Sequence, residues 1–215
     1  YAAVTRSPTA TGVITAWGCA TASDNGIVGL MERDRRQFLK TSGIVLSIAV
    51  AGDVLLLSPA SAHAAGLPYQ VLSADEVSTL EALAEALVPG AREAGVAQYI
   101  DKQLAAAPRD NLLMLKYLGV SPGDFTGFYR GGLSAAGQLA KLRFDRPWSS
   151  LDTSQASILL ADMAADQAKD WNGPPASFFH FVIRSDACDV VYGTEAGFGR
   201  IDIPYMAHIE PPRAW

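Results

Sequence analysis

The sequence predicts one small, mostly α-helical domain followed by a long irregular tail that is rich in Gly and Pro. Between Ser73 and Tyr192, apolar residues recur every three or four positions, which is the spacing of one helix face, and no segment alternates as a strand would. After Gly193, glycine and proline are too frequent for regular structure. An N-terminal leader accounts for residues 1–64, so the domain itself is expected over 65–215.

The leader is centred on the paired arginines Arg35 and Arg36, followed by Phe38 and Leu39. Two adjacent guanidiniums ahead of a moderately apolar run, here residues 43–57, are typical of a twin-arginine export signal. Such signals are addresses read by a receptor and are carried by proteins that leave the cytoplasm folded. The pattern therefore predicts export to the periplasm or to the outer face of the cell membrane.

The limits of the signal follow from its flanks. Met31 is a credible initiator, so residues 31–64 are interpreted as the signal and residues 1–30 as an upstream or disordered extension. Small residues place the cleavage site at Ala62-His63-Ala64, with Ala60-Ser61-Ala62 as a second candidate.

The apolar run 43–57 could instead be a retained membrane anchor. It has about 15 residues, fewer than the roughly 20 that span hydrocarbon. Asp53 also lies inside it. We expect a cleaved signal.

The first half of the domain should hold three helices. Ser73-Ala74-Asp75-Glu76 has the form of a capping box, which predicts a helix start, and Pro89-Gly90 predicts its end. A second helix is expected over about 94–106. A third is expected from Pro108, which suits the first turn of a helix, to Gly119.

In the second half, Gly131-Gly132 predicts a break in the helix that starts near Phe125, since each glycine costs about 1 kcal/mol relative to Ala. Residues 143–150 are expected to form a loop, and Asp152 to cap a helix that runs to about Lys169. The last helix, about 176–192, is apolar around most of its first half, which indicates burial between other elements or against a partner chain.

Charge and cysteine content exclude some classes of protein. The formal net charge is −5, and the Lys and Arg residues of the domain at 65–215 form no basic cluster, so a nucleic-acid partner is not expected. One of the two cysteines, Cys19, lies in the leader, and Cys188 has no partner for an internal disulfide.

No motif in the chain predicts a metal, haem, dinucleotide or serine-nucleophile site, so no catalytic, cofactor-binding or metal-binding residue is assigned. Of the polar residues of the last helix, His180, Arg184 and Cys188 are interpreted as packed residues of a semi-buried helix. Asp186 and Asp189 are three residues apart, so they can share one face, and they are interpreted as a carboxylate pair on a solvated surface. An export signal for folded proteins on a chain without a cofactor site suggests that the chain travels with a cofactor-containing partner.

Two other classes stay open. In a stand-alone exported helical enzyme or ligand-binding protein, Arg184, His180 and the pair Asp186 and Asp189 would line a pocket. In a membrane-anchored scaffold, the run 43–57 would remain uncleaved.

Both ends of the domain resemble one known family. The stretch from Asp189 to Phe198, the segment Ile203-Pro204-Tyr205-Met206-Ala207-His208-Ile209 and the final Pro211-Pro212-Arg213-Ala214-Trp215 are similar to the end of the gluconate 2-dehydrogenase subunit 3 family. The first helix, 72–89, resembles the opening of that family, and the twin-arginine leader is also similar.

The resemblance implies a small, non-catalytic subunit that pairs with a large flavoprotein of the glucose-methanol-choline oxidoreductase type. That partner would bind FAD and oxidise an alcohol, a sugar or a sugar acid, and a cytochrome subunit could accept the electrons. The small subunit would supply the export signal and help the large one to fold or to load flavin.

Aromatic and turn residues of the tail are the predicted partner interface, because large side chains with a polar end dominate interface hot spots. They are Tyr192, Gly193, Phe198, Pro204, Tyr205, His208 and Trp215. The alternative is that they fold back onto the helices of their own chain.

Overall fold

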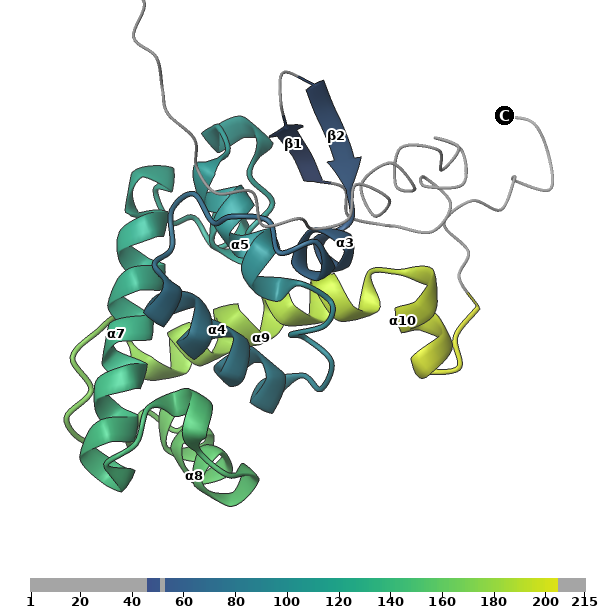
Figure 1. Ribbon diagram of the computed structural model, residues 1–215. Coiled ribbons are helices and arrows are strands. Elements are labelled where there is room, and N and C mark those ends of the chain that lie inside the picture. Colours follow the sequence, from purple (N-terminus) through teal and green to yellow (C-terminus); the bar gives the residue numbers. More distant parts are fainter. Residues whose placement is uncertain (1–45, 51–52, 205–215) are drawn as a thin grey trace, which may run out of the picture.

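The computed structural model describes residues 46–50 and 53–204, and this part of the chain is mostly helical (Figure 1). The elements are β1 (Leu46–Val50), β2 (Asp53–Leu57), α3 (Pro59–Ala64), α4 (Ala74–Leu87), α5 (Val96–Ala105), α6 (Met114–Tyr117), α7 (Phe125–Phe144), α8 (Thr153–Ala164), α9 (Ala176–Tyr192) and α10 (Glu195–Arg200). Short 3-10 turns are η1 (Pro108–Asp110), η2 (Pro122–Asp124) and η3 (Trp148–Ser150). The predicted fold class is confirmed; residues 205–215 of the predicted tail lie outside the described residues.

Helix α9 is the element against which most of the others pack. In Figure 1 it crosses the molecule behind α4, with α7 and α8 toward one end and α10 at the other. It contacts α4, α5, α6, α7, α8 and α10. Its inner side includes Phe179, Val182 and Ile183, none of which is exposed to solvent. The bounds 176–192 and the burial between other elements are both as predicted.

Helix α7 shows that the predicted break at Gly131-Gly132 is wrong, because the helix runs unbroken over 20 residues. The glycine is needed where α7 crosses α9: a Cβ at Gly132 would lie 2.1 Å from Cε2 of Phe179. The close approach lets the Phe179 ring pack against the α7 backbone. This packing outweighs the propensity cost of about 1 kcal/mol per glycine.

The third predicted helix, from Pro108 to Gly119, is largely wrong. Only η1 and the four-residue α6 form there. Side chains occupy the backbone groups that a helix would need: Gln103 Oε1 accepts the Leu112 N–H at 2.7 Å, and Asn111 Oδ1 accepts the Leu113 N–H at 2.8 Å. Such local side-chain to backbone bonds compete with helix formation.

Three boundaries differ in the second half of the chain. The predicted loop 143–150 contains the end of α7 and the turn η3, in which Trp148 is buried. Helix α8 ends at Ala164 and not near Lys169, because Asp166 takes a left-handed conformation with φ of 53° and its carboxylate binds Ser177. The tail holds a helix, α10, whose N-cap Thr194 accepts the Gly197 N–H.

Both predicted caps are confirmed as capping boxes. Ser73 and Glu76 bind each other's backbone N–H at the start of α4, and Asp152 and Gln155 do so at the start of α8. Each cap satisfies donors that the first turn of a helix leaves free.

The N-terminal part of the described chain forms elements that the sequence did not predict. The antiparallel strands β1 and β2, with Leu46 opposite Leu57, fall in the apolar run of the predicted signal. Helix α3 contains the predicted cleavage site. Arg35, Arg36, Phe38 and Leu39 lie outside the described residues. None of the described helices has both the length and the apolar character needed to cross a membrane.

Candidate functional site

The most enclosed charged group is the carboxyl of Asp186, on the inner side of α9. Its side chain is fully buried. Oδ1 accepts the backbone N–H of Met114, at the start of α6, at 2.9 Å. Oδ2 accepts the hydroxyl of Tyr129, which is also fully buried and comes from α7. The carboxyl thus joins three helices at the centre of the molecule.

Burial raises the pKa of Asp186 to about 7, while the hydrogen bonds from Tyr129 and Met114 act in the opposite direction. Burial also raises the pKa of Tyr129 well above its usual value, with the Asp186 carboxyl adding to the effect. A carboxyl with such a pKa can serve as a general acid or base when a substrate reaches it. Asp186 has no exposed surface and both of its oxygens are engaged, so its geometry is that of a structural link.

The other polar residues of α9 do not join Asp186. Residues two apart on a helix point about 200° apart, and Arg184 is exposed while Asp186 faces the core. Burial, and then the nearby Arg184 guanidinium, lower the pKa of His180. Burial raises the pKa of the Cys188 thiol, which favours the unreactive protonated form. Asp189 is exposed. The pair Asp186 and Asp189 is therefore split between core and surface, and the prediction of a solvated pair is wrong for Asp186, which faces the core.

A second buried carboxylate, Asp101 on α5, was missed by the sequence analysis. It accepts three consecutive backbone N–H groups, from Gln70 at 2.7 Å and from Val71 and Leu72 at 2.8 Å each. The bonds hold the segment that leads into α4 against α5. The signal in the sequence is an Asp directly after the apolar residues Tyr99 and Ile100, at the inner side of a helix.

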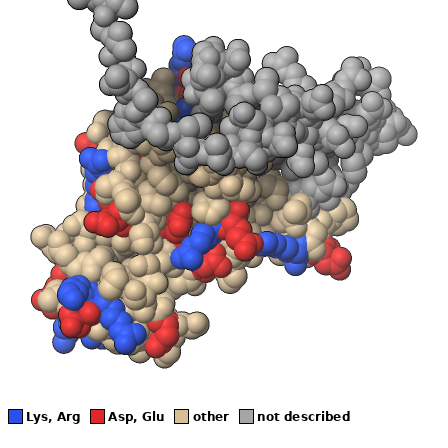
Figure 2. Space-filling model, viewed as in Figure 1, with Lys and Arg blue, Asp and Glu red and all other residues tan. Residues whose placement is uncertain are grey.

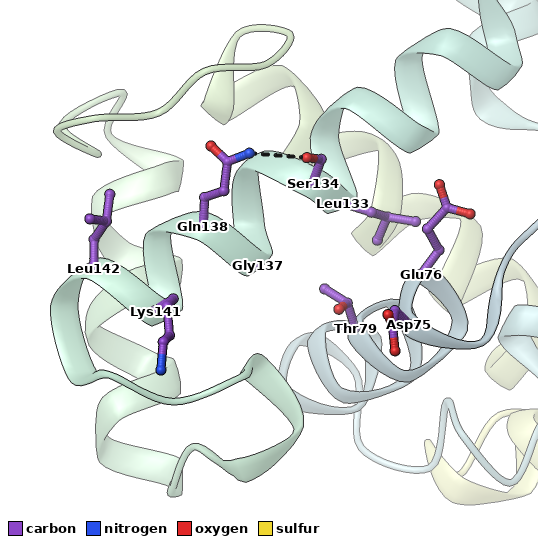
Figure 3. Close-up of a pocket in the computed structure, with 9 residues that line it drawn as sticks. All are labelled: Asp75, Glu76, Thr79, Leu133, Ser134, Gly137, Gln138, Lys141 and Leu142. Carbon is purple, nitrogen blue, oxygen red and sulfur yellow. Dashed lines mark hydrogen bonds between the residues drawn. The ribbon is translucent and has the colours of Figure 1, made fainter.

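A groove with a volume of about 630 Å³ runs between α4 and α7 (Figure 3). Its walls carry Asp75, Glu76 and Thr79 from α4, and Leu133, Ser134, Gly137, Gln138, Lys141 and Leu142 from α7.

Two charged groups of this groove, Glu76 and Lys141, have structural partners. Glu76 belongs to the α4 capping box and lies 3.4 Å from Nε of Arg130, and Lys141 pairs with Asp145. Leu142 is 66% exposed at one end. The groove has the form of an open contact surface and shows no acid–base pair.

Charges of both signs are interspersed over the face shown in Figure 2, with Lys and Arg side chains close to Asp and Glu. Arg143 and Asp162 form one ion pair between oppositely charged side chains, at 3.3 Å. Among the described residues, no group of three or more His, Cys, Asp or Glu side chains could hold a metal ion. The face in Figure 2 shows no continuous stripe of Lys and Arg side chains of the kind that binds phosphate groups.

The predicted interface residues are only partly described. Tyr192 is half-buried and packs against the core, and a Cβ at Gly193 would lie 2.3 Å from the Asp189 carbonyl oxygen, so both have roles within the chain's own fold. Phe198 is partly buried in α10, and Pro204 is exposed. Tyr205, His208 and Trp215 lie outside the described residues.

Comparison with known protein families shows that residues 74–208 match the family described as gluconate 2-dehydrogenase subunit 3. Neither the curated proteins nor the solved structures contain a match to this chain. The matched range begins at the first residue of α4 and includes α5 to α10, with the buried groups Asp101, Tyr129 and Asp186.

Proposed function

This chain belongs to the gluconate 2-dehydrogenase subunit 3 family, and we propose that it is the non-catalytic small subunit of an exported, FAD-dependent dehydrogenase of alcohols, sugars or sugar acids. The observation that carries the proposal is the family match over residues 74–208. Membership of a subunit family makes the chain part of a multi-subunit dehydrogenase complex.

In the proposed complex, a large flavoprotein of the glucose-methanol-choline type binds FAD and oxidises the substrate, and a cytochrome subunit can accept the electrons. The present chain supplies the twin-arginine signal at Arg35 and Arg36 and supports folding or flavin loading of its partner. Export then takes place after the two chains have assembled in the cytoplasm.

The buried carboxyl groups are bound within the fold by hydrogen bonds, which supports an accessory role. Asp186 links α9 to α6 and α7, and Asp101 fixes the segment before α4, so both carboxyl groups serve the fold. A stand-alone enzyme would require Arg184 and Asp186 in one pocket, and these two residues lie on different sides of α9. That separation favours the accessory subunit over the stand-alone enzyme.

The C-terminal segment is the surface that we expect to contact the flavoprotein. Helix α10 is held to the body by the Thr194 hydroxyl, which donates to the Val191 carbonyl of α9, and by Arg200, which donates to the Pro89 carbonyl. Beyond it, Ile201 and Ile203 are 47% and 50% exposed. Exposed apolar side chains that lead into a segment with Tyr205, His208 and Trp215 suit burial against a partner.

Co-expression with a candidate large flavoprotein subunit of the glucose-methanol-choline type tests the assignment. An affinity tag on the small subunit should recover a stable complex with bound FAD, and the small subunit expressed alone should carry no flavin and show no dehydrogenase activity. Stoichiometric flavin on the isolated chain would contradict the proposal.

A matched pair of substitutions tests the contact surface. Ile203→Asp should weaken the complex by at least about tenfold, since truncating or charging a central apolar contact costs about 2 kcal/mol or more. Ile158→Asp is the control, because Ile158 is also about half-exposed, at 45%, but lies on α8. Equal losses from both variants would argue against a C-terminal interface.

The export role is tested separately. Arg35→Lys combined with Arg36→Lys should retain both subunits in the cytoplasm while leaving the complex intact. If the flavoprotein is still exported when co-expressed with this variant, it carries its own export signal, and the proposed export role of the small subunit is wrong.

A further inference from the structure

Helix α3 is packed into the domain although it contains the predicted cleavage site. Pro59 and Ala62 are buried, and Ala62 has no exposed surface. Ser58 caps the helix by accepting the Ser61 N–H at 3.1 Å, and Nδ1 of His63 lies 3.6 Å from Oε1 of Glu81 on α4. The helix lies against α5.

The surface of the domain is shaped for this helix at Gly95, the residue before α5. Gly95 has φ of 79°, and a Cβ there would lie 2.2 Å from the Pro59 carbonyl oxygen and 2.9 Å from the Ala60 nitrogen. Only glycine allows the backbone of α3 to approach so closely. The contact therefore ties a residue within the predicted domain to residues of the predicted leader.

The segment after α3 continues along α5. Gln98 donates from Nε2 to the Leu67 carbonyl at 2.9 Å, and Asp101 accepts the N–H groups of Gln70, Val71 and Leu72. We call residues 58–72 the N-terminal strap. The strap explains why Gln98 and Asp101 are buried on α5, because it covers the side of the helix that carries them.

Cleavage after Ala64 would cut through this strap. A peptidase must bind its substrate as an exposed, extended segment, and a packed helix has to unfold locally before it can be cut. A passenger that is exported folded presents the strap already packed. On this basis we propose that α3 is a permanent part of the folded subunit, and that the leader is removed upstream of Ser58.

The proposal rests on the proposed export of the chain, and the mass of the exported subunit tests it. The complex is collected from outside the cytoplasm, and the first residue of the small subunit is determined by intact mass and N-terminal sequencing. The expected first residue lies at or before Ser58. A chain that begins at His63 or Ala65, the products of the two predicted cuts, would overturn the proposal.

Hydrogen exchange on the full chain decides whether α3 is packed, even if no export is observed. The Ala62, Ala65 and Leu67 amides donate to Ser58, Ser61 and Ala62 carbonyls, so they should exchange at least about 100-fold more slowly than in an unstructured peptide of the same sequence. Exchange at the peptide rate would refute the packed helix. Absence of export combined with slow exchange would count against the proposed function alone.

A matched pair of glycine variants links the packing to cleavage. Gly95→Ala should loosen α3, raise its exchange at least about tenfold and make the Ala64 site accessible to the peptidase. Gly119→Ala is the control, because Gly119 has a similar φ of 74° but open space around the new Cβ. If Gly95→Ala does not fold, Gln98→Met removes the bond to Leu67 and should loosen the strap more mildly. Unchanged exchange in α3 in every variant that folds would contradict the proposal.

Discussion

The buried carboxyl of Asp186 should make the stability of this subunit fall as the pH rises. Its pKa is about 7 in the folded chain against an ordinary value of 3.8, because burial disfavours the ionised form. The folded state therefore holds a proton that the unfolded state has lost. Stability is highest below about pH 4, declines up to about pH 7, and is level above that.

The magnitude follows from the difference between the two pKa values. Roughly three pKa units correspond to about 4 kcal/mol over the full range, and integration between pH 5 and pH 8 gives a loss of roughly 3 kcal/mol. For a domain of this size, a loss of roughly 3 kcal/mol is a large part of the free energy of unfolding, which is typically about 5 to 15 kcal/mol.

Urea unfolding at pH 5 and pH 8, for the wild type and for Asp186→Asn, measures the effect. The amide does not titrate, so the variant should lose the pH dependence that belongs to Asp186. The pKa of His180 is lowered in the folded chain, which makes stability rise with pH, and taking the difference between the two proteins removes this opposing contribution. A wild type whose unfolding free energy follows the same pH course as the variant would refute the reasoning.

Three further predictions concern packing and hydrogen bonding, each measured as the change in the free energy of unfolding. Gly132→Ala should destabilise the protein by about 1 to 3 kcal/mol through overpacking against Phe179. Gly137→Ala on the same helix has open space around its Cβ and should stabilise by up to about 1 kcal/mol. A change of the same sign in both variants would contradict this explanation. Asp101→Asn should cost about 3 kcal/mol, because an amide group cannot accept three N–H bonds, and a cost below about 1 kcal/mol would contradict the role of this carboxylate. Ser73→Ala should cost about 1 kcal/mol by removing the cap of α4, and a neutral result would mean that the cap adds little.

Local signals in the sequence predicted the elements whose structure is set locally. The capping residues Ser73 and Asp152 fixed where α4 and α8 begin, and the apolar pattern of 176–192 fixed α9. Each cap lies within the first turn of its helix, and the apolar pattern that predicts α9 lies within the helix itself.

The errors arose where a side-chain contact, distant or local, decides the structure. Glycine at position 132 predicts a helix break on propensity alone, but Phe179, 47 positions later in the chain, makes it a packing requirement. The side chains of Gln103 and Asn111 accept the backbone N–H groups of Leu112 and Leu113, and the third helix is shortened to four residues. Propensity is a weak prior that tertiary contacts override.

In the candidate site, too, the sequence shows the local pattern but not the contacts with other helices. Asp186 was noted on the last helix, but its burial depends on Tyr129 and Met114, from two other helices. The sequence does hold a hint, since Val182, Asp186 and Val190 recur at four-residue spacing, which places the carboxyl in an apolar stripe. An isolated carboxyl in such a stripe predicts a buried partner without saying which residue it is.

The predicted export signal and the folded domain overlap in the N-terminal strap. Small residues at Ala62 and Ala64 fit a peptidase site, and one of them, Ala62, is fully buried in the helix that lies against α5. The family match begins at residue 74, after the strap, yet Asp101 and Gln98 within the matched range are satisfied by residues 67–72. The folded unit therefore includes residues that pattern alone assigns to the leader, and the position of the cut decides whether α5 keeps the cover provided by α3.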